Sequence, residues 1–291
     1  MCPPKTWCWN ALKRYERGDD APDAAIPLRH ERDLNRLATD SALPPARVRT
    51  LFVSDLHLCA ARPQSNRSFF GFLEREARGA QALYILGDLF EYWVGDDDLG
   101  DAFNASVVSA LARLVAAGVP TYLMHGNRDF VIGDAFARAS GVKLLPDPAL
   151  LDLYGQPTLL MHGDTLCTLD QDYQAFRREV RSEAWIRNLL ERPLAERKAA
   201  VEALRRQSEQ EKRGKTAAIM DVAPAEVEDV LRRYGYPRLI HGHTHRPARH
   251  EHRLDGHVCE RWVLADWNQG GSYLACDASG CRAIQLDENR P

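Results

Sequence analysis

Residues 50–58 read TLFVSDLHL, a short apolar run followed directly by an aspartate and a histidine. The run is rich in β-branched, leucine and aromatic residues, which is typical of a strand buried on both faces. Asp55 and His57 are two residues apart, so on a regular strand their side chains would point to the same face. Ligands of open α/β sheets gather beyond the carboxyl ends of the strands. The stretch therefore predicts a buried strand that ends at a binding site.

The same arrangement recurs four more times along the chain. Apolar runs lead into four further motifs, which are Gly87-Asp88, Gly126-Asn127-Arg128-Asp129, His162-Gly163-Asp164 and His241-Gly242-His243-x-His245. Glycine beside a ligand lets the chain turn sharply and brings the backbone close to a bound group. Pooled at one edge, the motifs supply seven candidate ligands, which are Asp55, His57, Asp88, Asn127, His162, His243 and His245.

The chemistry of these side chains points to a pair of transition-metal ions. Imidazole, carboxylate and carboxamide ligands together suit Mn, Fe or Zn better than Mg or Ca. A carboxylate such as Asp88 can bridge two ions held ~3.5–4 Å apart, and a hydroxide between such ions is a strong nucleophile for phosphorus. A single motif of this kind is weak evidence, and we interpret His125 and His241 as structural. Five motifs, each after an apolar run, predict a dinuclear metal site.

The order of the five motifs resembles that of the calcineurin-like metallophosphoesterase superfamily, over residues from about Arg49 to Asp277. The resemblance implies an α/β fold, a four-layer α/β/β/α sandwich, with the strands of residues 257–286 in its second sheet. Most members carry a histidine general acid where this chain has Arg128. Arginine cannot give up its proton, but it can clamp a phosphate through two parallel hydrogen bonds.

Longer stretches narrow the resemblance to one branch of the superfamily. SDLHL, LGDLFEYWVGDD, GNRDF and HGHTHRPA resemble the enzymes that hydrolyse UDP-2,3-diacylglucosamine in lipid A biosynthesis. The resemblance implies cleavage of the diphosphate bond to UMP and 2,3-diacylglucosamine 1-phosphate, with two Mn²⁺ per chain and other divalent cations as alternatives. It also implies a cytoplasmic enzyme peripherally associated with the inner membrane of a Gram-negative bacterium.

The resemblance assigns roles residue by residue. One metal would be held by Asp55, His57, Asp88 and His245, and the other by Asp88, Asn127, His162 and His243. The catalytic residues would be Arg128, Asp88 and His243. Substrate contacts would come from Asn127, Arg128, Asp170, Ser208, Lys212, Lys215 and His243.

Residues 170–215 form a basic segment between the fourth and fifth motifs. Their Ala, Leu, Glu and Arg content predicts helix, and Pro193 would split the segment into a helical hairpin. Residues 177–215 carry twelve Lys or Arg against seven Glu. The segment is either a solvated hairpin packed on the main body or a lid over an anionic, acylated substrate. The resemblance favours the lid.

Two other functions are consistent with the motifs. A different dinuclear metallophosphoesterase would act on soluble phosphodiesters or nucleoside diphosphate derivatives. A non-catalytic scaffold would keep the sandwich for protein contacts. Arg128 and the helical insertion weigh against the first, and seven complete ligand positions weigh against the second.

Whole-chain properties bound the remaining possibilities. The formal net charge of −3 argues against a nucleic-acid partner, since such proteins usually present a basic face. We expect no membrane span, because no apolar run approaches ~18 residues, and no secretory signal in the first 25 residues. Residues 1–48 mix proline with charges and are expected to be a poorly ordered extension before a domain at 49–287. Cys59, Cys167 and Cys276 are interpreted as buried apolar residues in a reducing compartment, with no metal role.

Overall fold

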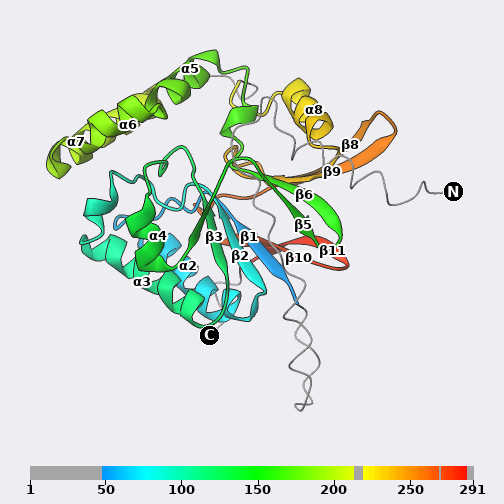
Figure 1. Ribbon diagram of the computed structural model, residues 1–291, viewed down its shortest axis with the longest axis horizontal. Coiled ribbons are helices and arrows are strands. Elements are labelled where there is room, and N and C mark those ends of the chain that lie inside the picture. The colour runs from blue at the N-terminus through cyan, green and yellow to red at the C-terminus, as the bar shows by residue number, and fades with distance from the viewer. Residues whose placement is uncertain (1–47, 213–218, 269, 287–291) are drawn as a thin grey trace, which may run out of the picture.

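The strand that begins at Thr50 lies in the middle of a six-stranded sheet in the computed structural model, which describes residues 48–212, 219–268 and 270–286 (Figure 1). The strand order of this first sheet is β11 (Gly280–Gln285), β10 (Ser272–Asp277), β1 (Thr50–Val53), β2 (Ala82–Leu86), β3 (Thr121–Met124) and β4 (Lys143–Leu145). Strands β1 to β4 run parallel, and β1, β2 and β3 are buried throughout. Their continuous apolar runs therefore reflect burial on both faces, as the sequence predicts.

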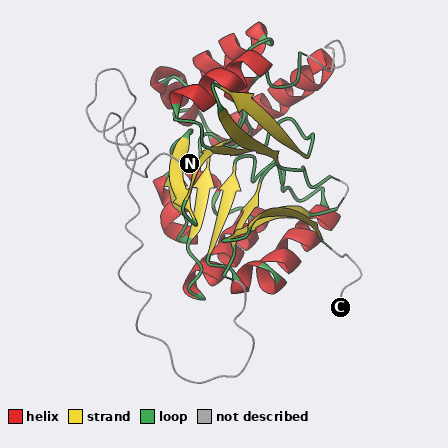
Figure 2. Ribbon diagram, turned by 90° about the vertical axis from the view of Figure 1, so that its right-hand side faces the viewer, coloured by secondary structure: helices red, strands yellow, loops and turns green. Residues whose placement is uncertain are grey.

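A second sheet of five strands packs face to face against the first (Figure 2). Its order is β5 (Ala149–Leu153), β6 (Gln156–Met161), β7 (Arg238–His241), β9 (His257–Val263) and β8 (Ala248–Leu254). Aromatic rings of the first sheet fill the space between the sheets, where Tyr84 stacks on Tyr122 with centroids 4.7 Å apart and on Phe52 with centroids 5.1 Å apart. Leu160 and Ile240 face them from the second sheet.

Helices cover the outer face of each sheet and complete the four layers. The first sheet is covered by α2 (Pro63–Arg75), α3 (Ala102–Ala116) and α4 (Asp134–Ser140), and the second by α8 (Pro224–Arg233). Three short 3₁₀ turns lie in the connections, which are η1 (Ala77–Gly79), η2 (Asp96–Asp98) and η3 (Asp164–Leu166). The predicted four-layer α/β/β/α sandwich is confirmed.

The C-terminal strands correct one expectation. Strand β9 lies in the second sheet, but β10 and β11 belong to the first, because β10 pairs antiparallel with β1. Leu274 of β10 packs between the sheets, whereas Tyr273 faces the helices. Cys276 is also not the free thiol that was expected, since it forms a disulfide with Cys281, its cross-strand partner in β11.

The basic segment forms three helices, α5 (Gln171–Val180), α6 (Glu183–Leu190) and α7 (Leu194–Lys212). The break before α7 falls at Pro193, as expected, but a second break at Arg181 was not expected. Ser182 caps α6 by accepting a hydrogen bond from the Trp185 backbone at 3.3 Å. We refer to α5–α7 as the three-helix insertion. No helix in the described ranges combines the length and the apolar character that crossing a membrane requires.

A buried arginine attaches the three-helix insertion to the main body. Arg197 of α7 is only 2% exposed. Its Nη1 donates to the carbonyl of Val94 at 2.6 Å, and its Nη2 pairs with Asp97. Trp185 and Ile186 of α6 pack against the same helical layer. Part of the apolar side of α6 therefore packs on the body, while Leu190 remains exposed.

Replacing Arg197 with methionine should loosen the insertion. The change keeps the apolar stem but leaves the Val94 carbonyl without its donor, which costs about 1–3 kcal/mol locally. Chymotrypsin cleavage within α6 and α7 should become about tenfold faster or more, as resolved by mass spectrometry. Arg192→Met, at an exposed arginine of the loop before α7, should behave like wild type. Equal cleavage rates in both variants would show that Arg197 is not the anchor.

Candidate metal centre

The five motif loops meet at one edge of the sandwich, beyond the carboxyl ends of β1, β2, β3, β6 and β7. Backbone hydrogen bonds join neighbouring loops, from Asp55 N to Gly87 O at 3.1 Å and from His57 N to Asp88 O at 3.0 Å. Gly242 N donates to His162 O at 2.8 Å in the same way across the second sheet. Residues far apart along the chain are thereby brought into contact, as in the pair of Asp55 and His243, which are 188 positions apart.

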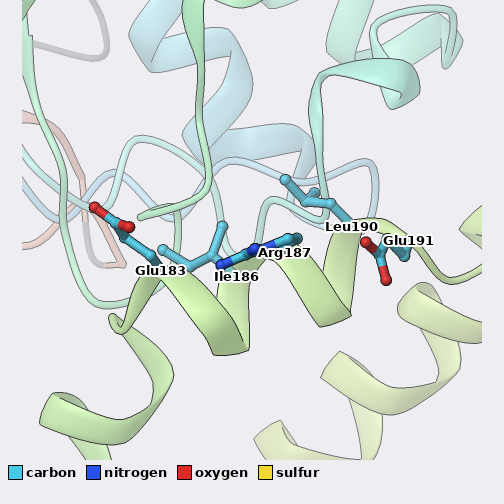
Figure 3. Close-up of a pocket in the computed structure, with 5 residues that line it drawn as sticks. All are labelled: Glu183, Ile186, Arg187, Leu190 and Glu191. Carbon is cyan, nitrogen blue, oxygen red and sulfur yellow. The ribbon is translucent and has the colours of Figure 1, made fainter.

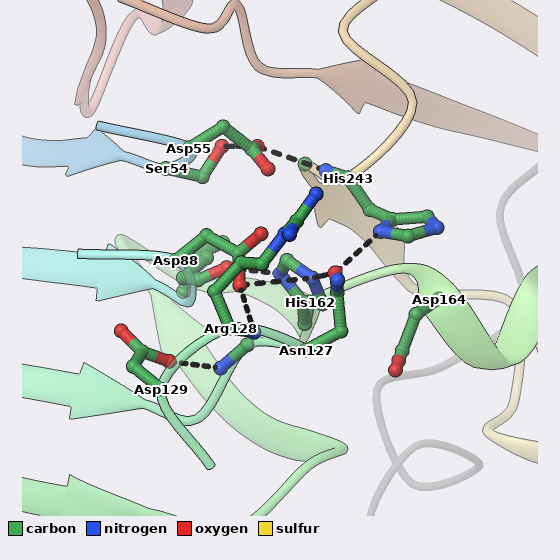
Figure 4. A network of polar contacts seen from close by, with 12 residues as sticks. Ser54, Asp55, Asp88, Asn127, Arg128, Asp129, His162, Asp164 and His243 are labelled. Carbon is green, nitrogen blue, oxygen red and sulfur yellow. Dashed lines mark hydrogen bonds and ion pairs between the residues drawn. The ribbon is translucent and has the colours of Figure 1, made fainter. Parts of the chain in front are cut away.

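The seven predicted ligands form two adjoining groups. Figure 4 shows Asp55, Asp88, Asn127, His162 and His243 of these seven. In the first, His245 Nε2 lies 3.3 Å from His57 Nε2 and 3.3 Å from Asp55 Oδ1. In the second, Asn127 Oδ1 lies 3.0 Å from His162 Nε2 and 3.0 Å from His243 Nδ1. Asp88 lies between the groups, and its two oxygens are each 3.9 Å from a histidine nitrogen, of His57 on one side and His162 on the other.

The ligand loops do not continue the strands, which corrects the expectation that Asp55 and His57 share a strand face. Both residues have left-handed backbone conformations, with φ of 52° and 48°. Asp88, His243 and His245 are also left-handed, with φ of 53°, 69° and 54°. Such conformations are strained for residues other than glycine and concentrate at functional sites. The ligands converge because the chain turns away from each strand.

At two glycines the backbone passes so close to an aspartate carboxylate that any side chain would collide with it. A Cβ on Gly126 would lie 2.1 Å from Asp88 Oδ1, and a Cβ on Gly242 would lie 2.3 Å from Asp55 Oδ2. Either side chain would displace a carboxylate of the site. These glycines therefore set how closely the Asn127 and His243 loops approach the two aspartates.

Electrostatics at this edge favour bound cations. Burial raises the pKa of Asp88 to about 7, with Asp129 and Asp55 adding to the effect. Burial opposes protonation of His162, but the carboxylates of Asp88, Asp164 and Asp55 outweigh it and raise its pKa to about 9. Asp55 Oδ1 is buried and faces the ring of His245 at 3.3 Å. Several buried carboxylates facing imidazole nitrogens are costly without positive charge, so the donor set fits a divalent metal centre.

Neighbouring groups hold the carboxylates in place. Asp129 accepts from the backbone of Leu89 at 2.7 Å and of Gly126 at 2.8 Å, so it ties the second motif to the third. Asp55 Oδ2 accepts from Ser54 Oγ at 2.6 Å and from His243 N at 2.8 Å. Asp88 Oδ1 accepts from the Arg128 backbone at 2.8 Å. These bonds leave the remaining carboxylate oxygens directed toward the histidines.

The predicted substrate residues divide into three sets. Arg128 lies among the ligands in Figure 4, where its charge adds to the burial that lowers the pKa of His57 and partly offsets the burial that raises the pKa of Asp88. Asp170 lies at the start of α5, where it accepts from the Tyr173 backbone at 3.2 Å. Lys215 and the side chains of Ser208 and Lys212 lie outside the residues that the structure describes, as do residues 1–47 of the expected extension.

The motif residue Asp164 has a role that the sequence did not predict. It is fully buried and accepts from Arg177 Nε at 2.7 Å and from Tyr173 Oη at 2.9 Å. Arg181, 3.5 Å from the same carboxylate, donates to the Gly126 carbonyl at 2.7 Å. The start of the three-helix insertion is therefore bonded directly to the metal-ligand loops. The HGD motif marked Asp164 as a candidate functional residue. Its partners Tyr173 and Arg177 lie in α5, where no motif marks them.

Two acidic residues outside the motifs also approach the ligands. Glu91 lies 3.9 Å from His57 Nδ1 and pairs with Arg62 at 3.0 Å. Asp266 lies 3.6 Å from His245 Nδ1. Carboxylates behind ligating histidines orient the rings and raise their basicity.

Comparisons with known proteins agree with this geometry. Residues 48–247 match the family model of calcineurin-like phosphoesterases. A protein of Aromatoleum aromaticum named UDP-2,3-diacylglucosamine hydrolase is 56% identical over 79% of this chain and 94% of its own. Proteins of the same name from Pseudomonas paraeruginosa and Xanthomonas campestris are 52% and 50% identical, over 80% and 81% of this chain and 96% and 98% of their own.

Divalent metal should raise the thermal stability of the protein through Asp88. Metal at about 100 times its dissociation constant contributes about 2.7 kcal/mol, which corresponds to a rise in Tm of roughly 5–10 °C for a domain of this size. Asp88→Asn should lose most of the Mn²⁺-dependent rise measured by differential scanning fluorimetry. Asp134→Asn, at an exposed carboxylate of α4, should retain it. A full Mn²⁺ response in Asp88→Asn would contradict the assignment.

Asp164→Asn should destabilise the protein by roughly 3 kcal/mol, because it leaves the Arg177 guanidinium without its buried partner. Urea unfolding measures the loss. Arg177→Gln provides the second edge of a double-mutant cycle, and the double variant should cost about 1–3 kcal/mol less than the sum of the single ones. Additive losses would show that the two side chains are not coupled.

Proposed function

The chain belongs to the calcineurin-like phosphoesterase family, and we propose that it hydrolyses the diphosphate bond of UDP-2,3-diacylglucosamine. The products are UMP and 2,3-diacylglucosamine 1-phosphate. One observation carries the proposal: relatives named for this hydrolase match at 50–56% identity over 94–98% of their own length. Because the match spans nearly the whole length of these relatives, the activity is proposed for the domain as a whole.

We propose two divalent cations, with Mn²⁺ as the native metal. Asp55, His57, Asp88 and His245 hold one, and Asp88, Asn127, His162 and His243 hold the other. The position of Asp88 between the two groups supports its role as the shared ligand. When bound, such a pair polarises phosphoryl oxygens and lowers the pKa of a bound water, which supplies the nucleophile.

The side chains around the metals orient the diphosphate. Arg128 clamps non-bridging oxygens through its guanidinium, and Asn127 and His243 bring further donors to the same phosphate. His243 is proposed to stabilise, with Arg128, the charge that develops on phosphorus. Arg128 cannot act as a general acid, but a phosphomonoester is a good leaving group and needs little protonation. The arginine therefore suits a diphosphate better than an alkyl phosphodiester.

The three-helix insertion is proposed to cover the acylated sugar. A pocket of about 480 Å³ lies along α6, lined by Glu183, Ile186, Arg187, Leu190 and Glu191 (Figure 3). Ile186 and Leu190 give it an apolar wall suited to acyl chain, and Leu190 is 41% exposed. Asp170, Ser208, Lys212 and Lys215 are proposed to contact the sugar phosphate from the ends of the insertion.

The chemistry of the substrate also indicates where the enzyme works. A diacylated nucleotide sugar is held at a bilayer surface by its chains. We propose that the protein acts in the cytoplasm of a Gram-negative bacterium, peripherally on the inner membrane. The basic character of the insertion supports contact with anionic lipid.

The assay follows UMP release from UDP-2,3-diacylglucosamine by Mn²⁺-loaded protein. Asp88→Ala should abolish release, because it removes the shared ligand. Arg128→Ala should lower kcat/KM by about 10²–10³, the usual cost of removing one transition-state donor, and Arg128→Lys should recover only part of it.

Two outcomes would contradict the proposal. Hydrolysis of a soluble phosphodiester without UMP release from the lipid would leave a metallophosphoesterase of another specificity. Full activity in Arg128→Ala would remove the phosphate clamp from the mechanism.

A further inference from the structure

A second pocket lies on the outer face of the second sheet, away from the three-helix insertion. Its volume is about 460 Å³, within the range of small-ligand sites. Val222 just before α8, Val227 in its first turns and Val263 of β9 form its apolar walls. In Figure 1, α8 with β8 and β9 lies to one side of the strand ends and α5–α7 lies to the other. None of the residues assigned to the metals, the diphosphate or the acylated sugar lines this pocket.

The pocket adjoins the metal-ligand loop. Thr244 lines it and is the residue between the ligands His243 and His245, and Arg246 lines it directly after them. Consecutive Cα atoms are about 3.8 Å apart, so the pocket wall is one residue away from both ligands. Thr244 Oγ1 is buried and has no hydrogen-bond partner in the described part of the chain. A ligand that reached from the metals into this pocket would pass this hydroxyl.

The polar part of the pocket carries excess positive charge. Arg261 is only 8% exposed, and it donates to His252 Nε2 and His241 Nε2, each at 3.2 Å. Over the described residues, no carboxylate forms an ion pair with it, although buried arginines usually have one. The other cation, Arg246, is paired with Asp221. The pocket therefore favours a ligand rich in hydrogen-bond acceptors.

We propose that this pocket binds the uridine half of the substrate. The inference rests on the proposed function. A diphosphate at the metals carries two substituents, the sugar and the nucleoside, which extend from it in different directions. The acylated sugar has an apolar pocket along α6, and the nucleoside needs another. Uracil offers two carbonyl acceptors to Arg261 and Thr244, and its faces suit the valine walls. The second pocket thus makes the chain selective for a pyrimidine nucleotide.

Filling the pocket tests the assignment. Ala248 lies on its rim, so Ala248→Trp should fill it, while Val258→Trp adds the same bulk to an exposed position of β9 outside the pocket. Calorimetry on the Mn²⁺-loaded proteins would compare UMP, AMP and inorganic phosphate. Wild type and Val258→Trp should bind UMP at least about tenfold more tightly than AMP or phosphate, a preference of about 1.4 kcal/mol. Ala248→Trp should lose that preference and keep its affinity for phosphate.

Thr244→Val provides a second test that barely changes volume. It should weaken UMP binding by about fivefold, as expected for a lost hydrogen bond, and leave phosphate binding as in wild type. Equal affinity of wild type for UMP and AMP, or an unchanged UMP preference in both pocket variants, would overturn the inference. Failure of wild type to release UMP from the lipid substrate would instead overturn the proposed function, because the binding comparison does not require turnover.

Discussion

Concentrated negative charge at one edge of the sandwich is the constraint on which the rest of the structure depends. Asp55 and Asp88 are buried together, and burial, to which the charges of Asp129 and Asp55 add, raises the pKa of Asp88 to about 7. Three features keep these carboxylates in place. The ligand loops are strained, glycines let them approach closely, and Asp129 holds two of them together by accepting backbone hydrogen bonds. Compensating cations lower the cost of this arrangement, so the fold and the metal chemistry have to be explained together.

The sequence predicted the strands, and the polar side chains that meet at their ends, well, because both signals are local. An apolar run and the polar residues that follow it lie within ten positions, as in residues 50–58. Strand pairing is not local, and so β10 was assigned to the wrong sheet although its alternation was plain. The left-handed conformations of Asp55 and His57 were also missed, since no local rule requires them for these residue types.

Positioning residues were harder to predict than ligands for a related reason. Asp164 belongs to a recognisable motif, but its function depends on Arg177 of α5 and on Arg181 just after that helix, a segment that presents only a basic composition. Arg261 is similar, because its burial beside two histidines follows from how β9 packs rather than from its neighbours in sequence. Charged residues gain their roles from partners distant along the chain, and one sequence does not reveal those partners.

The bonds from Arg181 to Gly126 and Asp164 connect the three-helix insertion to a loop that carries a metal ligand. Two sites joined in this way are thermodynamically linked, and linkage is reciprocal. If cations order the Asn127 loop and thereby the turn at Arg181 between α5 and α6, a molecule bound beneath the insertion strengthens cation affinity by the same factor. The chain would then retain its metals best while it is occupied, and release of the second product would be the moment at which they exchange with the surrounding pool.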